Sequence, residues 1–137
     1  MRSSDLSARF ACQDLMIESY RLVDEGKASD VTRLFTDDGE FLIEGIAAIS
    51  GRESLSGFFE ARENDRTRQT KHCLTNLYFN LTAANEATIH ATLLLFVLGS
   101  EDATIPEAVA EVEDRYRREG ETWHIAARRT TPLAGGR

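Results

Sequence analysis

The feature that most constrains this fold is a run of strand-like segments that fills the second half of the chain. Apolar and β-branched residues predict strands over residues 71–82, 87–98, 107–118 and 122–131. The turn sequences AANEA and REGE separate the strands of the first and last pairs. Long consecutive strands that short turns connect form antiparallel meanders, so we expect an antiparallel sheet here.

The first half of the chain has helical spacing instead. Ser4 or Asp5 can cap a first helix that runs to about Glu25, where Gly26 is placed to end it. A short second helix is expected to cover residues 31–35.

A first strand, at about residues 40–44, is expected to follow a turn. Ser50 and Glu53 then match a capping box, which predicts a third helix ending at about Arg62. The apolar residues expected to face inward from this helix are Leu55, Phe58 and Phe59.

This order of elements predicts one α+β domain over residues 1–137, with the helices packed on one face of the sheet. The strand TIHATLLLFVL is apolar on both faces from Leu93 onward, so its second face also needs a cover. Another copy of the chain is the simplest cover, and we expect a homodimer or homotrimer.

Charge and composition exclude several classes of partner. The net charge of −7 disfavours a general surface for nucleic acid or anionic membrane. The basic cluster RYRRE is flanked by acidic residues and is typical of a solvated strand end. No segment is long enough to span a bilayer and the N-terminus lacks an apolar signal segment, so a cytoplasmic location is expected. Cys12 and Cys73 sit in apolar surroundings and are expected to be free thiols.

Motifs for bound cofactors are missing from the sequence. The three histidines have no metal-ligand spacing, and neither HxxxH nor HExxH occurs. Patterns of nucleophile elbows, P-loops and dinucleotide-binding turns are absent too. We therefore expect no metal and no cofactor.

His72 is the residue on which a catalytic interpretation turns. The two-residue repeat of a strand groups His72 with Leu74, Asn76 and Tyr78 on one face. A histidine in that setting is more often a packing residue than a base, unless a carboxylate holds one ring nitrogen.

Asp24 is a candidate for that carboxylate. It ends the first helix, where the exposed carbonyls disfavour a negative charge by about 0.3–1 kcal/mol. Either water solvates it, or it faces a partner across the gap between helix and sheet. Tyr20 lies one turn earlier and shares its helix face. Sequence spacing alone does not place Asp24 beside His72.

The other two histidines are weaker candidates. His90 alternates with Thr92, Leu94 and Phe96, so it either faces the same cavity as His72 or is a strand residue near the sheet edge. His124 points away from its neighbour Trp123, which is expected to be in the core.

Several segments, in order, resemble the SnoaL-like branch of the NTF2-like superfamily from about Leu6 to Arg129. They are YRLVDEGKASDVTRLFTDDGEFLIEG, GRESLSGFFEAR, TKHCLTNLYF and VEDRYRREGETWHIAARR. This resemblance implies a curved antiparallel sheet that wraps around the N-terminal helices and encloses a conical pocket.

Within that superfamily, the segments QDL, IEGI, TNL and TPLAG resemble the scytalone dehydratase and hexachlorocyclohexane dehydrochlorinase group. In this group an aspartate at the end of the first helix orients a histidine at the start of a strand, and the histidine abstracts a proton. The matching positions are Asp24 and His72. Tyr20 is similar to the pocket tyrosines with which some dehydratases polarise a carbonyl.

One departure from the group affects the expected chemistry. The dehydrochlorinases have a lysine on the first helix that assists the leaving chloride, and Ser19 stands at that position. A second cationic group of theirs, an arginine, falls on Arg115 or Arg117, and the register leaves both open. The resemblance thus implies loss of water or isomerisation in preference to loss of chloride.

Two hypotheses follow from these residues. The first is a cofactor-independent lyase or isomerase of a small apolar cyclic or polyketide-like substrate, with His72 as base, Asp24 as its partner and Tyr20 as polariser. The residues expected to contact the substrate or shape its pocket are His90, Ser19, Arg115, Phe59, Leu94, Leu55 and Phe96. The second is a non-catalytic binding module or a structural subunit, like the β subunits of ring-hydroxylating dioxygenases.

Overall fold

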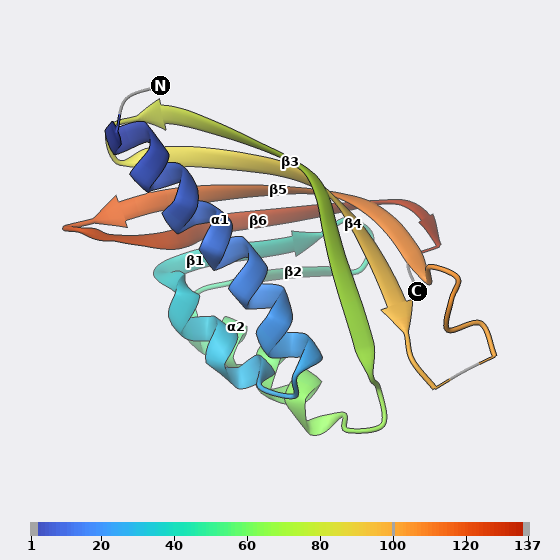
Figure 1. Ribbon diagram of the computed structural model, residues 1–137. Helices are drawn as coiled ribbons and strands as arrows, with labels where there is room; N and C mark the ends of the chain where they lie inside the picture. The colour runs from blue at the N-terminus through green and yellow to red at the C-terminus, as the bar shows by residue number, and fades with distance from the viewer. Residues whose placement is uncertain (1–2, 100, 136–137) are drawn as a thin grey trace.

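The helices lie on one side of a curved, six-stranded sheet (Figure 1). The computed structural model describes residues 3–99 and 101–135. Its elements are α1 (Ser3–Asp24), η1 (Ala28–Leu34), β1 (Phe35–Ile43), β2 (Ala47–Ser50), α2 (Arg52–Asn64), β3 (Thr70–Ala83), β4 (Glu86–Val97), β5 (Ala108–Glu119) and β6 (Thr122–Gly135).

The strands are arranged in the order β2-β1-β6-β5-β4-β3. The strands from β3 to β6 form the expected antiparallel meander. The pair of β1 and β6 is parallel, which makes the sheet mixed at that one junction. The α+β class with a curved sheet is confirmed, and α1 crosses the concave face (Figure 1).

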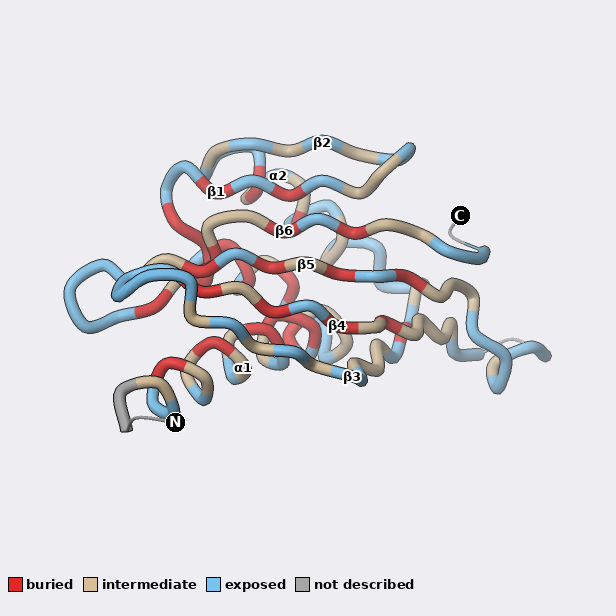
Figure 2. Tube along the Cα trace, turned by 90° about the horizontal axis from the view of Figure 1, so that it is seen from above, coloured by how far each residue is buried: buried red, intermediate tan, exposed pale blue. Residues whose placement is uncertain are grey.

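The core lies between α1 and the middle strands. Buried positions gather along one side of α1 and along β4, β5 and β6, while the turns from β3 to β4 and from β5 to β6 are exposed (Figure 2). Four phenylalanine rings pack beside this core between β1 and α2, with ring centroids 5.2–6.4 Å apart. These rings are Phe35, Phe41, Phe58 and Phe59.

The first helix ends as its sequence predicts. Gly26 has a φ of +80°, and its N–H donates to the carbonyl of Val23. The start differs from expectation, because the helix begins at Ser3 and Asp5 lies inside its first turn. The side chain of Ser4 lies outside the described residues.

The predicted capping box of the third helix is wrong. Ser50 is the last residue of β2, a short strand that the sequence did not indicate. Gly51 is the N-cap residue of α2, with a φ of +88° and no side-chain cap. A backbone with that φ favours glycine, so the helix begins one position later than the capping box requires. The second helix is a 3-10 helix that ends at Leu34, and β1 is longer than expected.

A bulge in β3 changes which residues share a face. The register between β3 and β4 shifts between Thr75 and Tyr78, and Asn76 has a φ of +56°. Leu77, Phe79 and Leu81, after the bulge, therefore pack against the core on the same side as Leu74 before it. The expected grouping of His72 with Tyr78 is wrong, since 68% of the Tyr78 surface is exposed on the outer face.

Four sequence expectations concern the cysteines, membrane spanning, the oligomeric state and the location of the protein. Cys12 and Cys73 are free thiols, as expected, and burial raises the pKa of Cys12 to about 12, with help from Asp114. In the described part of the chain, no helix is long and apolar enough to cross a membrane. The homodimer or homotrimer and the cytoplasmic location stay predictions.

The bulge makes a testable prediction at Asn76. Replacing Asn76 by valine should lower the free energy of unfolding by about 1–2 kcal/mol, because a β-branched residue is strained at positive φ. Asn76→Gly should leave stability unchanged or improve it. Asn80→Val is the control, at an exposed β3 residue whose φ is not positive, and it should cost little. Equal losses in urea unfolding for Asn76→Val and Asn80→Val would contradict a strained bulge.

Candidate active site

Asp24 joins the end of α1 to the start of β3. Its Oδ1 accepts a hydrogen bond from Thr70 Oγ1 at 2.9 Å and lies 2.6 Å from His72 Nδ1. Its Oδ2 accepts the backbone N–H of His72 at 2.8 Å. Only 8% of the Asp24 side chain and 13% of the His72 side chain are exposed. Asp24 is thus not solvated by water alone but faces a partner across the gap between helix and sheet.

These contacts keep Asp24 ionised. Burial acts to raise the pKa of its carboxyl, but the ring and backbone of His72 and the hydroxyl of Thr70 outweigh that effect. The pKa of Asp24 is therefore lower than its ordinary value. An ionised Asp24 accepts the proton on Nδ1 of His72, which leaves Nε2 as the nitrogen with a lone pair.

Tyr20 lies beside this pair. Its ring centroid is 5.0 Å from that of His72, and the tyrosine is buried. Burial raises the pKa of Tyr20 to about 12, although Arg128 acts to lower it. The hydroxyl is therefore protonated at neutral pH. It makes no well-directed hydrogen bond with the described residues, and Thr130 is its polar neighbour.

A buried arginine, Arg128, completes the floor of the site. Its Nε and Nη2 donate to the two oxygens of Asp114, each at 2.7 Å, and Nη2 also donates to Ser19 Oγ at 2.8 Å. Tyr116 adds a hydrogen bond of 2.7 Å to Asp114. Burial acts to lower the pKa of Arg128, but the negative charge and hydrogen bonds of Asp114, together with two nearby tyrosines, raise the pKa by more than burial lowers it. The arginine is therefore always charged.

The guanidinium of Arg128 also packs on aromatic rings. It lies 4.5 Å from the centroid of Tyr20 and 5.9 Å from those of Phe35 and Phe41. The bonds to Asp114 and Ser19 use Nε and Nη2. The N–H groups on Nη1 are the donors that remain for a ligand.

These side chains border a cavity with two adjoining lobes. The helix lobe, of about 210 Å³, is bordered by residues of α1, β1 and α2 and by the start of β3. The sheet lobe, of about 220 Å³, is bordered by residues of β1, β4, β5 and β6. The lobes adjoin because the same residues line both, namely Tyr20, Phe41, Ile43, Arg68, His72 and Leu95.

The structure brings four of the expected site residues to this cavity. Ser19, Tyr20, Phe59 and His72 line the helix lobe, and Asp24 lies behind His72. Ser19 contributes no charge to the cavity. Its hydroxyl oxygen instead accepts a hydrogen bond from Arg128. Leu55 is fully buried in the core and lines neither lobe.

The expected positions of His90, Leu94 and Phe96 at the cavity are wrong. Their neighbours Ile89, Ala91, Leu93 and Leu95 turn inward from β4, so the alternate residues lie on the outer face. There His90 is exposed and its Nε2 lies 3.3 Å from Glu113. The strand is apolar on both faces beyond Leu93, and its alternation therefore did not reveal which face is the inner one.

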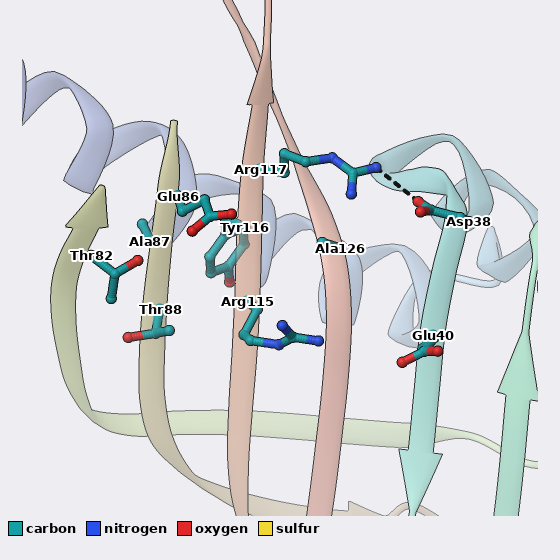
Figure 3. Close-up of a pocket in the computed structure, with 10 residues that line it drawn as sticks. All are labelled: Asp38, Glu40, Thr82, Glu86, Ala87, Thr88, Arg115, Tyr116, Arg117 and Ala126. Carbon is teal, nitrogen blue, oxygen red and sulfur yellow. Dashed lines mark hydrogen bonds and ion pairs between the residues drawn. The ribbon is translucent and has the colours of Figure 1, made fainter. Parts of the chain in front are cut away.

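Arg115 and Arg117 lie on the outer face as well. They border a separate depression of about 240 Å³ that Figure 3 shows on the side of the sheet away from α1. Arg117 binds Asp38 there at 2.8 Å. The expectation that one of these two arginines reaches the cavity is wrong, and Arg128 is the one that does.

A second bulge explains why the sequence did not indicate Arg128. The register between β5 and β6 shifts between Arg115 and Tyr116. Ile125 is buried before the shift, and Arg128 and Thr130 are buried after it. A strict two-residue alternation from Ile125 would place Arg128 on the outer face. Both strands carry other charged residues, so charge alone did not distinguish Asp114 and Arg128 from their exposed neighbours.

A metal ion in a protein needs several ligand side chains that converge on it. In the ranges that the structure describes, no group of three or more His, Cys, Asp and Glu side chains is arranged to hold a metal ion.

Comparison with known proteins identifies the family. The family model of the SnoaL-like domain matches residues 4–129. This chain belongs to the SnoaL-like domain family. The γ-hexachlorocyclohexane dehydrochlorinase of Sphingobium indicum is 30% identical over 139 residues, which cover 95% of this chain and 86% of that protein.

Solved structures confirm the NTF2-like fold. An NTF2-like protein with a cystatin-like fold from Novosphingobium aromaticivorans has a TM-score of 0.82 at 22% identity, over 96% of this chain and 85% of that one. A proposed scytalone dehydratase from the same species has a TM-score of 0.80 at 16% identity, over 98% and 89% of the two chains. At these identities the likeness shows the fold.

The buried pair of Arg128 and Asp114 makes a prediction about stability. Asp114→Asn should lower the free energy of unfolding by about 3–5 kcal/mol, since it leaves a buried guanidinium without its counter-charge. The control is Asp37→Asn, which breaks the exposed pair with Arg52 and should cost less than about 1 kcal/mol. Similar losses for both variants in chemical denaturation would contradict the importance of the buried pair.

The low pKa of Asp24 makes a prediction about pH. A carboxyl whose pKa is lower in the folded than in the unfolded chain stabilises the fold above the unfolded value of about 3.9, and this stabilisation is lost as pH falls through the folded pKa. The wild type should therefore exceed Asp24→Asn in unfolding free energy above about pH 5. The difference should shrink in more acidic buffer. A difference that is the same at all pH values would show that the carboxylate charge contributes nothing.

Proposed function

We propose that this protein is a cofactor-independent lyase or isomerase that removes a proton from carbon in a small, largely apolar cyclic substrate. The observation that carries this proposal is the contact between Asp24 and His72 at the wall of the cavity. An aromatic and aliphatic lining with a few polar groups is typical of sites for small organic molecules.

His72 is the general base in this proposal. Its Nδ1–H donates to the ionised Asp24, so Nε2 carries the lone pair that accepts the proton from the substrate. The same carboxylate stabilises the imidazolium that forms when the proton arrives. The second bond of Asp24, to the backbone N–H of His72, fixes the position of the ring relative to α1.

Tyr20 and Arg128 stabilise the negative charge that develops on the substrate. The Tyr20 hydroxyl is protonated at neutral pH, is buried and has no strong partner among the described residues. It is free to donate to a carbonyl oxygen as that oxygen becomes an enolate. The Nη1 donors of Arg128 act on the same charge from the floor of the cavity. Donors fixed in advance in a dry site stabilise such charges more than water does.

The reaction is balanced by one proton and one electron pair. The C–H bond breaks, its proton moves to Nε2 of His72, and its electron pair forms the enolate. In an elimination, the enolate pair then forms a C=C bond and expels a β-hydroxyl group, which takes the proton from His72 and leaves as water. In an isomerisation, His72 returns the proton to a different carbon of the enolate.

Loss of water fits these residues better than loss of chloride. Ser19 is uncharged and is engaged by Arg128 and by the carbonyl of Met16. The charge of Arg128 is balanced by Asp114. The relative in Sphingobium indicum is named for the loss of hydrogen chloride, but the lysine that the resemblance implies for that step is replaced here by Ser19.

A structural subunit without catalysis is supported less well. Such a subunit needs no cavity, and its core can be filled. Here two lobes of about 210 and 220 Å³ adjoin at His72. The pair of a histidine and an ionised aspartate at an apolar cavity also has no packing advantage over apolar residues.

The experiment is a turnover screen with matched histidine variants. Small cyclic ketones with a β-hydroxyl group are incubated in D₂O and followed by proton NMR for loss of water or for deuterium at the α carbon. For any compound that turns over, His72→Ala should lower the rate by about 10²–10⁴-fold. His90→Ala, at an exposed histidine on the outer face, should leave it unchanged. A His72→Ala variant as active as the wild type on that compound would refute the base.

A further inference from the structure

The cavity has a charge opposite to that of the protein. The chain carries a net charge of −7, but no Asp or Glu is among the described residues that line either lobe. The ionisable residues at the cavity wall are His72, Tyr20 and the arginines Arg62, Arg68 and Arg128. Asp24 and Asp114 lie behind His72 and Arg128, as their partners. The wall thus presents donors and positive charge to whatever enters.

The three arginines differ in how far they are already engaged. Arg128 is bound to Asp114 and Ser19. Arg62 donates to the carbonyls of Asp65 and Arg68 and to the hydroxyl of Thr70. The side chain of Arg68, in contrast, makes no hydrogen bond and no ion pair within the described residues.

Arg68 also lies where the cavity and the protein surface adjoin. It lies in the loop between α2 and β3 and lines both lobes as well as a crevice on the adjoining surface. Its carbonyl accepts from Arg62 at 3.0 Å, and its N–H donates to the carbonyl of Asp65 at 3.3 Å. Hydrogen bonds thus hold the backbone of Arg68, whereas no described residue binds its guanidinium.

The acidic residues near Arg68 do not neutralise it through a direct contact. They line the adjoining crevice, and each binds a different group: Asp24 binds His72, Glu25 binds Arg21, Glu63 binds Ser29 and Asp65 binds Thr67. A half-buried guanidinium that has no counter-ion among the described residues, and that lies beside an apolar cavity, attracts a carboxylate more strongly than it would in open water.

We propose that the substrate of this site carries a carboxylate on its apolar ring system, and that Arg68 binds this carboxylate at the junction of the two lobes. The proposal rests on the proposed function in that it names the substrate class of the same cavity. The apolar part of the substrate fills the lobes, with its reacting carbon at His72. The planar fork of the guanidinium suits the two oxygens of a carboxylate.

The test compares two ligands of the same shape and different charge. Naphthalene-2-carboxylate and naphthalene-2-carboxamide are titrated into the wild type, and their dissociation constants are measured by calorimetry. A charge-assisted hydrogen bond should make the carboxylate bind at least about tenfold more tightly than the amide. Equal affinities, or no binding of the carboxylate up to its solubility limit, would overturn the proposal.

Two arginine variants test whether Arg68 is the residue that makes the site prefer the carboxylate to the amide. Arg68→Gln should abolish the preference for the carboxylate and leave the affinity for the amide unchanged. Arg66→Gln makes the same charge change on the same loop, at an exposed residue that lines only the crevice, and it should keep the preference. An equal loss in both variants would show that a general field, and not Arg68, selects the ligand, and it would also overturn the proposal.

The binding measurement is independent of turnover. If His72→Ala did not slow catalysis, the proposed function would be refuted. The preference of the wild type for the carboxylate would still be measurable. If the wild type did not prefer the carboxylate to the amide, the proposed substrate class would be refuted and the proposed role of His72 would be unaffected.

Discussion

The organisation of the site depends on one carboxylate, that of Asp24. It stands at the negative end of the α1 dipole, where a charge of its sign is unfavourable unless donors compensate for it. Thr70 and His72, at the start of β3, supply three such donors. The same contacts attach the helix to the sheet, fix the ring of His72 at the cavity and lower the pKa of Asp24. Stability and the proposed chemistry therefore share one set of hydrogen bonds.

The positive charges of the cavity are divided between two tasks. Arg128 is buried, bound to both oxygens of Asp114 and stacked over Tyr20. A lysine at the position of Ser19 would add a second cation to this space, where Asp114 is the one carboxylate among the described residues that contacts Arg128. Ser19 instead accepts a hydrogen bond from Arg128 and so orients its guanidinium. Arg68, at the junction of the lobes, has no side-chain partner among the described residues, and we propose that it binds a ligand.

Periodicity predicted the elements of this fold well and its faces less well. The end of α1 at Gly26 and the meander from β3 to β6 follow from local turn chemistry and alternation. The pairing of Asp24 with His72 needed the family resemblance, because residues 48 positions apart carry no local signal of contact. Arg128 was missed and His90 misplaced because a bulge resets the alternation in β6 and because β4 is apolar on both faces. Such departures from strict alternation depend on contacts that form only in the folded sheet.

The most direct test of the account is the position of the proton on His72, measured by ¹⁵N NMR of the imidazole at neutral pH. The account predicts a proton on Nδ1 and a lone pair on Nε2 in the wild type. In Asp24→Asn, the amide oxygen should stay on the backbone N–H of His72 and the amide NH₂ should face the ring. The proton should then move to Nε2. A wild type with its proton on Nε2, or a variant in which the proton does not move, would contradict the central claim that Asp24 makes His72 a base.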